Sequence, residues 1–110
     1  MKFYRKLYLG EGTKKHWKKI VWKLKHRVGQ IGIFVLALPE GQGLLEIYHN
    51  SLLQQKYYKK YPPFIIGIAK GYDEATNVAV DIIKEVYEKT GGFDVKNYLL
   101  KEKGKEISFR

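Results

Sequence analysis

Cysteine is absent from this sequence of 110 residues, and methionine occurs once. Without cysteine the chain has no disulfide, no thiolate metal site and no cysteine nucleophile, which fits a reducing compartment. The longest apolar run, residues 31–38, is far shorter than the roughly 20 residues that span a bilayer. The first residues also lack an apolar stretch of signal-peptide length. We therefore expect a cytoplasmic protein without a transmembrane segment.

Histidine and serine are scarce, which leaves few groups for catalysis. The only histidines are His16, His26 and His49, and the only serines are Ser51 and Ser108. Neither serine has the context of a nucleophile elbow, and no Walker A or Gly-x-Gly-x-x-Gly pattern is present. The sequence therefore predicts no catalytic residue, no metal site and no cofactor. A dyad assembled by the fold stays open, so the enzyme question is undecided and leans towards a non-enzyme.

Negative charge is scarce at the amino-terminal end. The chain has a formal net charge of +10, and most of this excess lies in its first quarter. Residues 1–27 carry ten Lys and Arg side chains against one carboxylate, whereas residues 72–110 carry seven against eight. Solubility alone needs no such concentration of one sign in a single segment. The asymmetry favours a polyanionic partner.

Strand and helix signals follow one another in the order β-α-β-β-α-β-α-α. Period-two or two-sided apolar patterns, bounded by Gly and Pro, predict strands over residues 3–9, 31–38, 44–49 and 64–69. Capping residues, helical periodicity and terminal glycines predict helices over residues 14–28, 52–61, 73–89 and 94–100. For the first helix, Thr13 is the expected N-cap and Gly29 the expected left-handed residue after its end.

The second and fourth strands, residues 31–38 and 64–69, are apolar on both faces, which is typical of central strands covered by helices on both sides. In a ferredoxin-like sheet these two strands would be at the edges. We therefore predict an α/β sandwich of two or three layers around a four-stranded mixed sheet, with ferredoxin-like order as the alternative. Residues 1–100 are expected to form one domain, and residues 101–110 a flexible tail.

The first helix contains two tryptophans that cannot point the same way. With a rotation of 100° per residue, Trp17 shares an apolar stripe with Ile20, Val21, Leu24 and Val28. Trp22 lies 140° from Trp17, among lysines. Either another segment or a partner covers this second indole, or it is exposed as a stacking platform within a basic surface.

These patterns define two candidate surfaces. The polyanion-binding candidates are Lys14, Lys15, Lys18, Lys19, Trp22, Lys25 and His26. A secondary basic and aromatic patch comprises Lys56, Tyr57, Lys59 and Lys60. We predict a small basic module that binds a polyanion, with nucleic acid ranked first, through the Lys/Trp-rich helix. The alternatives are a protein-interaction or homo-oligomeric module, and an enzyme acting on a small anionic substrate.

Overall fold

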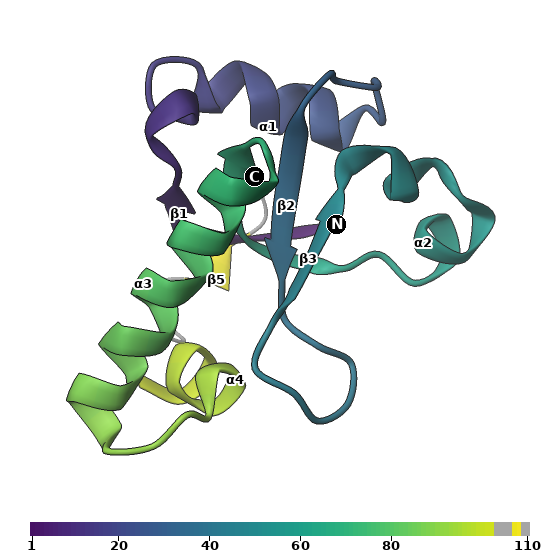
Figure 1. Ribbon diagram of the computed structural model, residues 1–110. Helices are drawn as coiled ribbons and strands as arrows, with labels where there is room; N and C mark the ends of the chain where they lie inside the picture. Colours follow the sequence, from purple (N-terminus) through teal and green to yellow (C-terminus); the bar gives the residue numbers. More distant parts are fainter. Residues whose placement is uncertain (103–106, 109–110) are drawn as a thin grey trace.

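A computed structural model describes residues 1–102 and 107–108 and shows an α/β fold (Figure 1). The sheet consists of β1 (Lys2–Leu9), β2 (Ile33–Ala37), β3 (Glu46–His49), β4 (Phe64–Lys70) and β5 (Ile107–Ser108). The strand order is β3-β2-β4-β1-β5, with β4 parallel to β1 and β2 antiparallel to both β4 and β3.

The predicted mixed sheet is confirmed, and so is the placement of the two most apolar strands at its centre. The ferredoxin-like alternative is wrong, because β2 and β4 are neighbours inside the sheet and not its edges. The short strand β5 pairs antiparallel with β1, within the segment expected to be a tail. Residues 103–106 and 109–110 of that segment lie outside the described residues.

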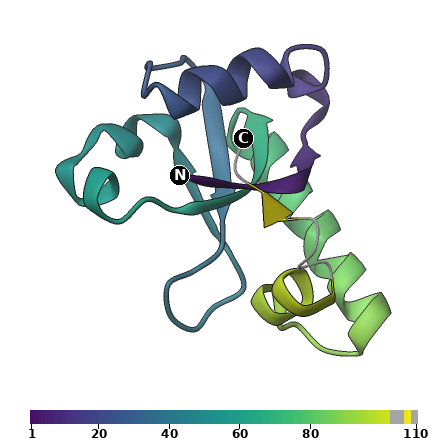
Figure 2. The same ribbon diagram turned by 180° about the vertical axis from the view of Figure 1, so that it is seen from behind.

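Helices cover both faces of the sheet and give three layers (Figures 1 and 2). One face is covered by α1 (Trp17–Lys25), and the other by α3 (Tyr72–Thr90) and α4 (Val95–Asn97). The short helix α2 (Lys56–Lys60), which follows β3 and precedes β4 in the sequence, stands beside the β3 edge of the sheet (Figure 1). Short 3-10 turns occupy Glu11–Thr13 and Asn50–Gln54, and a π turn follows α4 over Tyr98–Glu102.

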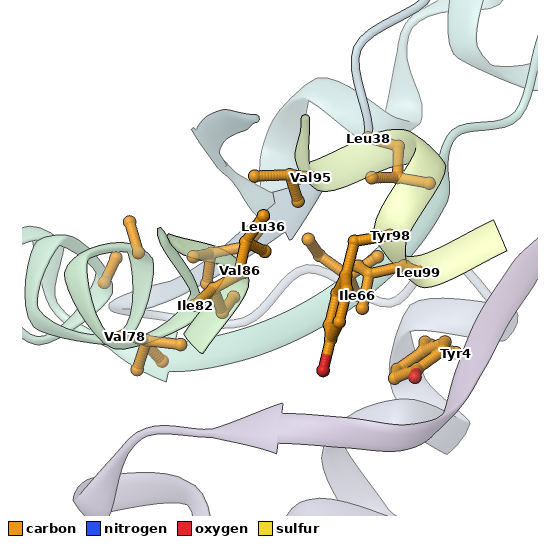
Figure 3. Close-up of a cluster of buried hydrophobic side chains, with 13 residues drawn as sticks. Tyr4, Leu36, Leu38, Ile66, Val78, Ile82, Val86, Val95, Tyr98 and Leu99 are labelled. Atoms are coloured by element: carbon orange, nitrogen blue, oxygen red, sulfur yellow. The ribbon is translucent and has the colours of Figure 1, made fainter. Parts of the chain in front are cut away.

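Each face of the sheet has its own hydrophobic core. Below α3 and α4, side chains from both helices meet those of three strands (Figure 3); the labelled members are Tyr4, Leu36, Leu38, Ile66, Val78, Ile82, Val86, Val95, Tyr98 and Leu99. Below α1, the buried members are Phe3, Ile20, Val21, Leu24, Ile33, Val35, Ala37, Leu53, Ile65 and Ile68. Neighbouring residues of β4 face opposite cores, which is why its sequence is continuously apolar.

The first helix is shorter at both ends than predicted. Thr13 does not cap it but lies in the preceding 3-10 turn, where its hydroxyl donates to the Gly10 carbonyl. At the other end α1 stops at Lys25, and Arg27, with φ of 54°, supplies the left-handed residue expected at Gly29. Val28 is consequently 43% exposed and not part of the core.

The side chain of Asn50 sets the start of β2. It is buried, donates to the carbonyls of Gln30 and Ile33, and accepts from the Gln30 N–H. This clamp holds residues 30–33 in a turn, so β2 begins at Ile33 and Ile31 is fully exposed. The helix predicted over residues 52–61 is also interrupted, because Gln55 has extended backbone angles between the 3-10 turn and α2.

Candidate polyanion-binding site

The core-facing stripe of α1 is the one that its periodicity predicts, apart from Val28. Ile20, Val21 and Leu24 are buried, and Trp17 is half-buried against the same core. These contacts fix the rotation of the helix about its axis. The opposite side of α1, which carries Trp22 and most of the lysines, is therefore turned away from the sheet.

The indole of Trp22 is 55% exposed, so no described element covers it fully. The imidazole of His26, one helical turn later, stacks on it with the ring centroids 4.1 Å apart and the planes 24° apart. A hydrogen-bond contact of 2.8 Å between His26 Nδ1 and the Trp22 carbonyl oxygen holds the imidazole in place. One face of the indole is thus occupied from within the helix.

A shallow hollow of about 290 Å³ lies on α1 between the two tryptophans. Trp17, Val21 and Trp22 provide its apolar surface, and Lys18 and Lys25 also line it. The ammonium of Lys18 lies 5.7 Å from the centroid of the Trp17 ring. Helical periodicity assigns Trp17 and Val21 to the core alone. The spacing of five residues between the tryptophans is the signal in the sequence that could have indicated a shared hollow.

Most of the predicted basic residues have no carboxylate partner. Lys15, Lys18, Lys19 and Lys25 make no ion pair with another described residue, and neither does Lys23, which was not predicted. Lys14 differs, because its ammonium is 2.8 Å from a carboxylate oxygen of Glu11 in an exposed pair. The structure therefore brings the predicted residues together on and just before α1, with Lys14 partly neutralised by its neighbour.

Glu74, in the first turn of α3, anchors the segment between β1 and α1. Its carboxylate accepts from the backbone N–H of Gly12 at 2.8 Å and from that of Lys70 at 2.6 Å. The Gly10 N–H in turn donates to the Ile68 carbonyl of β4. These bonds tie the segment between β1 and α1 to the end of β4 and the first turn of α3, and so position the turn that carries Lys14 and Lys15.

The far end of α1 is anchored by Arg27. Its guanidinium donates to the carbonyl oxygens of Leu53 and Tyr58, which belong to the 3-10 turn and to α2. Arg27 is thereby used structurally. This clamp also places the secondary patch of α2 next to the carboxyl-terminal end of α1.

The secondary patch is less clearly suited to anions than α1. Lys56, Lys59 and Lys60 are exposed, but the hydroxyl of Tyr57 donates to both oxygens of Glu40, at 3.0 and 2.9 Å. This hydrogen bond raises the pKa of Tyr57 and places a carboxylate beside the patch. Next to it is a hollow of about 410 Å³ that the sequence did not indicate; its aromatic and proline lining is Pro39, Tyr57, Tyr58, Tyr61, Pro62, Pro63 and Phe64.

The described residues contain one contact between a histidine and a serine. His49 Nδ1 is 2.9 Å from Ser51 Oγ and accepts the Ser51 backbone N–H at 3.1 Å. The backbone donor therefore engages the nitrogen that a general base would need, and the arrangement caps the 3-10 turn that follows.

The described part of the chain has neither a metal-binding cluster nor a helix that could cross a membrane. No three or more His, Asp or Glu side chains are grouped so that they could hold a metal ion. None of the described helices has the length and apolar character needed to cross a membrane. No protein-family model, curated protein or solved structure matches this chain.

Proposed function

We propose that this protein is a small basic binding module for a polyanion, with nucleic acid as the first-ranked ligand, and that α1 is its contact surface. The single observation that carries the proposal is the exposed indole of Trp22 within a cluster of lysines that lack carboxylate partners among the described residues. This combination supplies cations for phosphates and a flat aromatic face for a base.

Charge supplies the attraction in this proposal. A phosphate backbone releases condensed counterions when lysines neutralise it, so the affinity should fall steeply with salt, by about 0.7 to 0.9 log units per log unit of salt for each phosphate contacted. The cluster on α1 is suited to this role because it is exposed and the core-facing stripe of the helix is separate from it. Ligand binding and folding then use different sides of one helix.

The proposal is tested by the triple change Lys15→Ala, Lys18→Ala and Lys19→Ala. We expect weaker binding of a labelled oligonucleotide, measured by fluorescence anisotropy, and a shallower salt dependence, by about 0.7 to 0.9 for each lysine that contacts a phosphate. The matched control replaces three lysines of α3 and α4, on the other side of the sheet, by alanine: Lys84, Lys89 and Lys96. Both variants then have the same net charge.

If the α3/α4 control weakens binding as much as the α1 variant, the effect is one of net charge and the assignment to α1 is wrong. If the α1 variant keeps both its affinity and its salt dependence, the polyanion proposal fails. If neither the wild type nor the control binds the oligonucleotide at low salt, the second candidate remains, a protein-interaction or homo-oligomeric module. The aromatic and proline-lined hollow beside α2 is the observation that favours that candidate.

A further inference from the structure

The two faces of the Trp22 indole are not equivalent. His26 stacks on one face, with 4.1 Å between the ring centroids. The hollow beside Trp22 has Trp17 and Val21 as further apolar lining and is about 290 Å³ in volume. Since the imidazole already occupies one face, a ligand that stacks on Trp22 has to enter from the side of this hollow.

The chemistry of the hollow defines the group that fits it. Its interior is aromatic and aliphatic, which suits a flat apolar ring. Lys18 and Lys25 also line the hollow, and Lys15 and Lys19 lie on the turn before α1 and in its first turn. A nucleobase attached to a phosphate backbone matches both features, because its ring can stack while its phosphates meet the lysines.

We propose that this surface selects single-stranded nucleic acid and takes one unstacked base into the hollow between Trp17 and Trp22; the inference rests on the polyanion-binding function proposed above. In a duplex each base is stacked on its neighbours and exposes only its edges in the grooves. A single strand can turn a base out of the backbone and offer its face. The stacked pair of His26 and Trp22 then becomes a stack of three rings.

The test compares three labelled ligands at one salt concentration. The first is a short single strand of thymidylate, the second is a backbone of the same length with abasic sites throughout, and the third is a duplex closed at both ends by linkers that carry no bases. The first two carry the same phosphates, so their difference in affinity isolates the bases. The closed duplex has no free end on which an indole could stack.

We expect the wild type to bind the thymidylate strand about 5- to 150-fold more tightly than the abasic strand, the range that corresponds to one stacked base. Trp22→Ala should remove this preference and leave the affinity for the abasic strand unchanged. Trp22→Phe, which keeps a smaller ring, should retain part of it. The control Tyr87→Ala removes another half-exposed aromatic ring, on α3, and should retain the full preference.

The outcomes separate this inference from the proposed function. Equal affinity for the thymidylate and abasic strands, or tighter binding of the closed duplex, overturns the single-strand inference and leaves binding of a polyanion standing. Failure to bind all three ligands at low salt overturns both. A preference that survives in Trp22→Ala, with circular dichroism showing that the variant is folded, also overturns the inference, because the base would then stack elsewhere.

Discussion

Gly10, in the loop that leads into α1, has no room for a side chain while Glu74 occupies its present position. A Cβ added at Gly10 would lie 2.7 Å from Cδ and 2.8 Å from Cγ of Glu74, and closer still to its Oε2. The backbone of Gly10, with φ of −67° and ψ of 155°, is acceptable for alanine. The change Gly10→Ala therefore tests one contact, because it adds no backbone strain.

The expected cost follows from the bonds that Glu74 loses when the new methyl group displaces it. Its carboxylate accepts from the N–H groups of Gly12 and Lys70. Because both bonds are exposed to water, we assign each about 1–1.5 kcal/mol, the upper part of the range for an ordinary hydrogen bond and no more than the lower limit for a charged acceptor. Alanine restores about 0.4–1 kcal/mol by restricting the unfolded chain. The net loss is about 1–2.5 kcal/mol, which lowers the unfolding midpoint by roughly 4–10 °C.

Urea and thermal unfolding of four proteins measure this contact: the wild type, Gly10→Ala, Glu74→Ala and the double variant. Glu74→Ala should lose the same two bonds. In that background Gly10→Ala should raise the free energy of unfolding by about 0.4–1 kcal/mol, because no Glu74 side chain is left to displace. Two results would refute the reasoning. One is a Gly10→Ala variant as stable as the wild type, and the other is a double variant whose loss is the sum of the two single losses.

Two further predictions concern polar groups inside the fold. Asn50→Ala removes three hydrogen bonds and leaves the Ile33 carbonyl without its donor, so it should lower the free energy of unfolding by about 2–4 kcal/mol, measured with urea; a loss below about 1 kcal/mol would contradict the clamp. Burial, and the carboxylate of Glu85 to which its hydroxyl donates at 3.0 Å, raise the pKa of Tyr8. An unfolded tyrosine ionises near pH 10, so the stability should fall as the pH rises above about 10. Tyr8→Phe should make this alkaline loss smaller, and an unchanged pH dependence would argue against the raised pKa.

The sequence predicted the sheet because its strands differ in how many of their faces are apolar. β2 and β4 are apolar on both faces, and the structure places them side by side at the centre. The ends of the elements were less predictable. The early end of α1 depends on Arg27, which takes a left-handed conformation and bonds to carbonyls of Leu53 and Tyr58, about 30 positions away in the sequence. A local pattern has no access to such a partner.

The candidate site was predictable only in part, namely where its geometry depends on the local rotation of one helix. Helical rotation separated Trp22 from Trp17 and placed it outside the core-facing stripe, but left open whether another segment covers it. The structure answers this, because Trp22 is 55% exposed. The stacking of His26 on Trp22 is also local, since one helical turn separates them. The pairing of Tyr57 with Glu40 and the hollow beside α2 were not predictable, because they join segments that only the hairpin of β2 and β3 brings together.

The position of α1 bears on whether its basic side is a by-product of folding. The helix is held to the sheet by Ile20, Val21 and Leu24, and its two ends are held by Glu74 and Arg27. None of these contacts uses the exposed indole of Trp22 or the ammonium groups of the neighbouring lysines. Clustering like charges on one helix opposes folding through mutual repulsion, and an exposed indole leaves apolar surface in water. A surface that costs stability and takes no part in the contacts that hold α1 in place supports the proposal that this side of the helix meets a ligand.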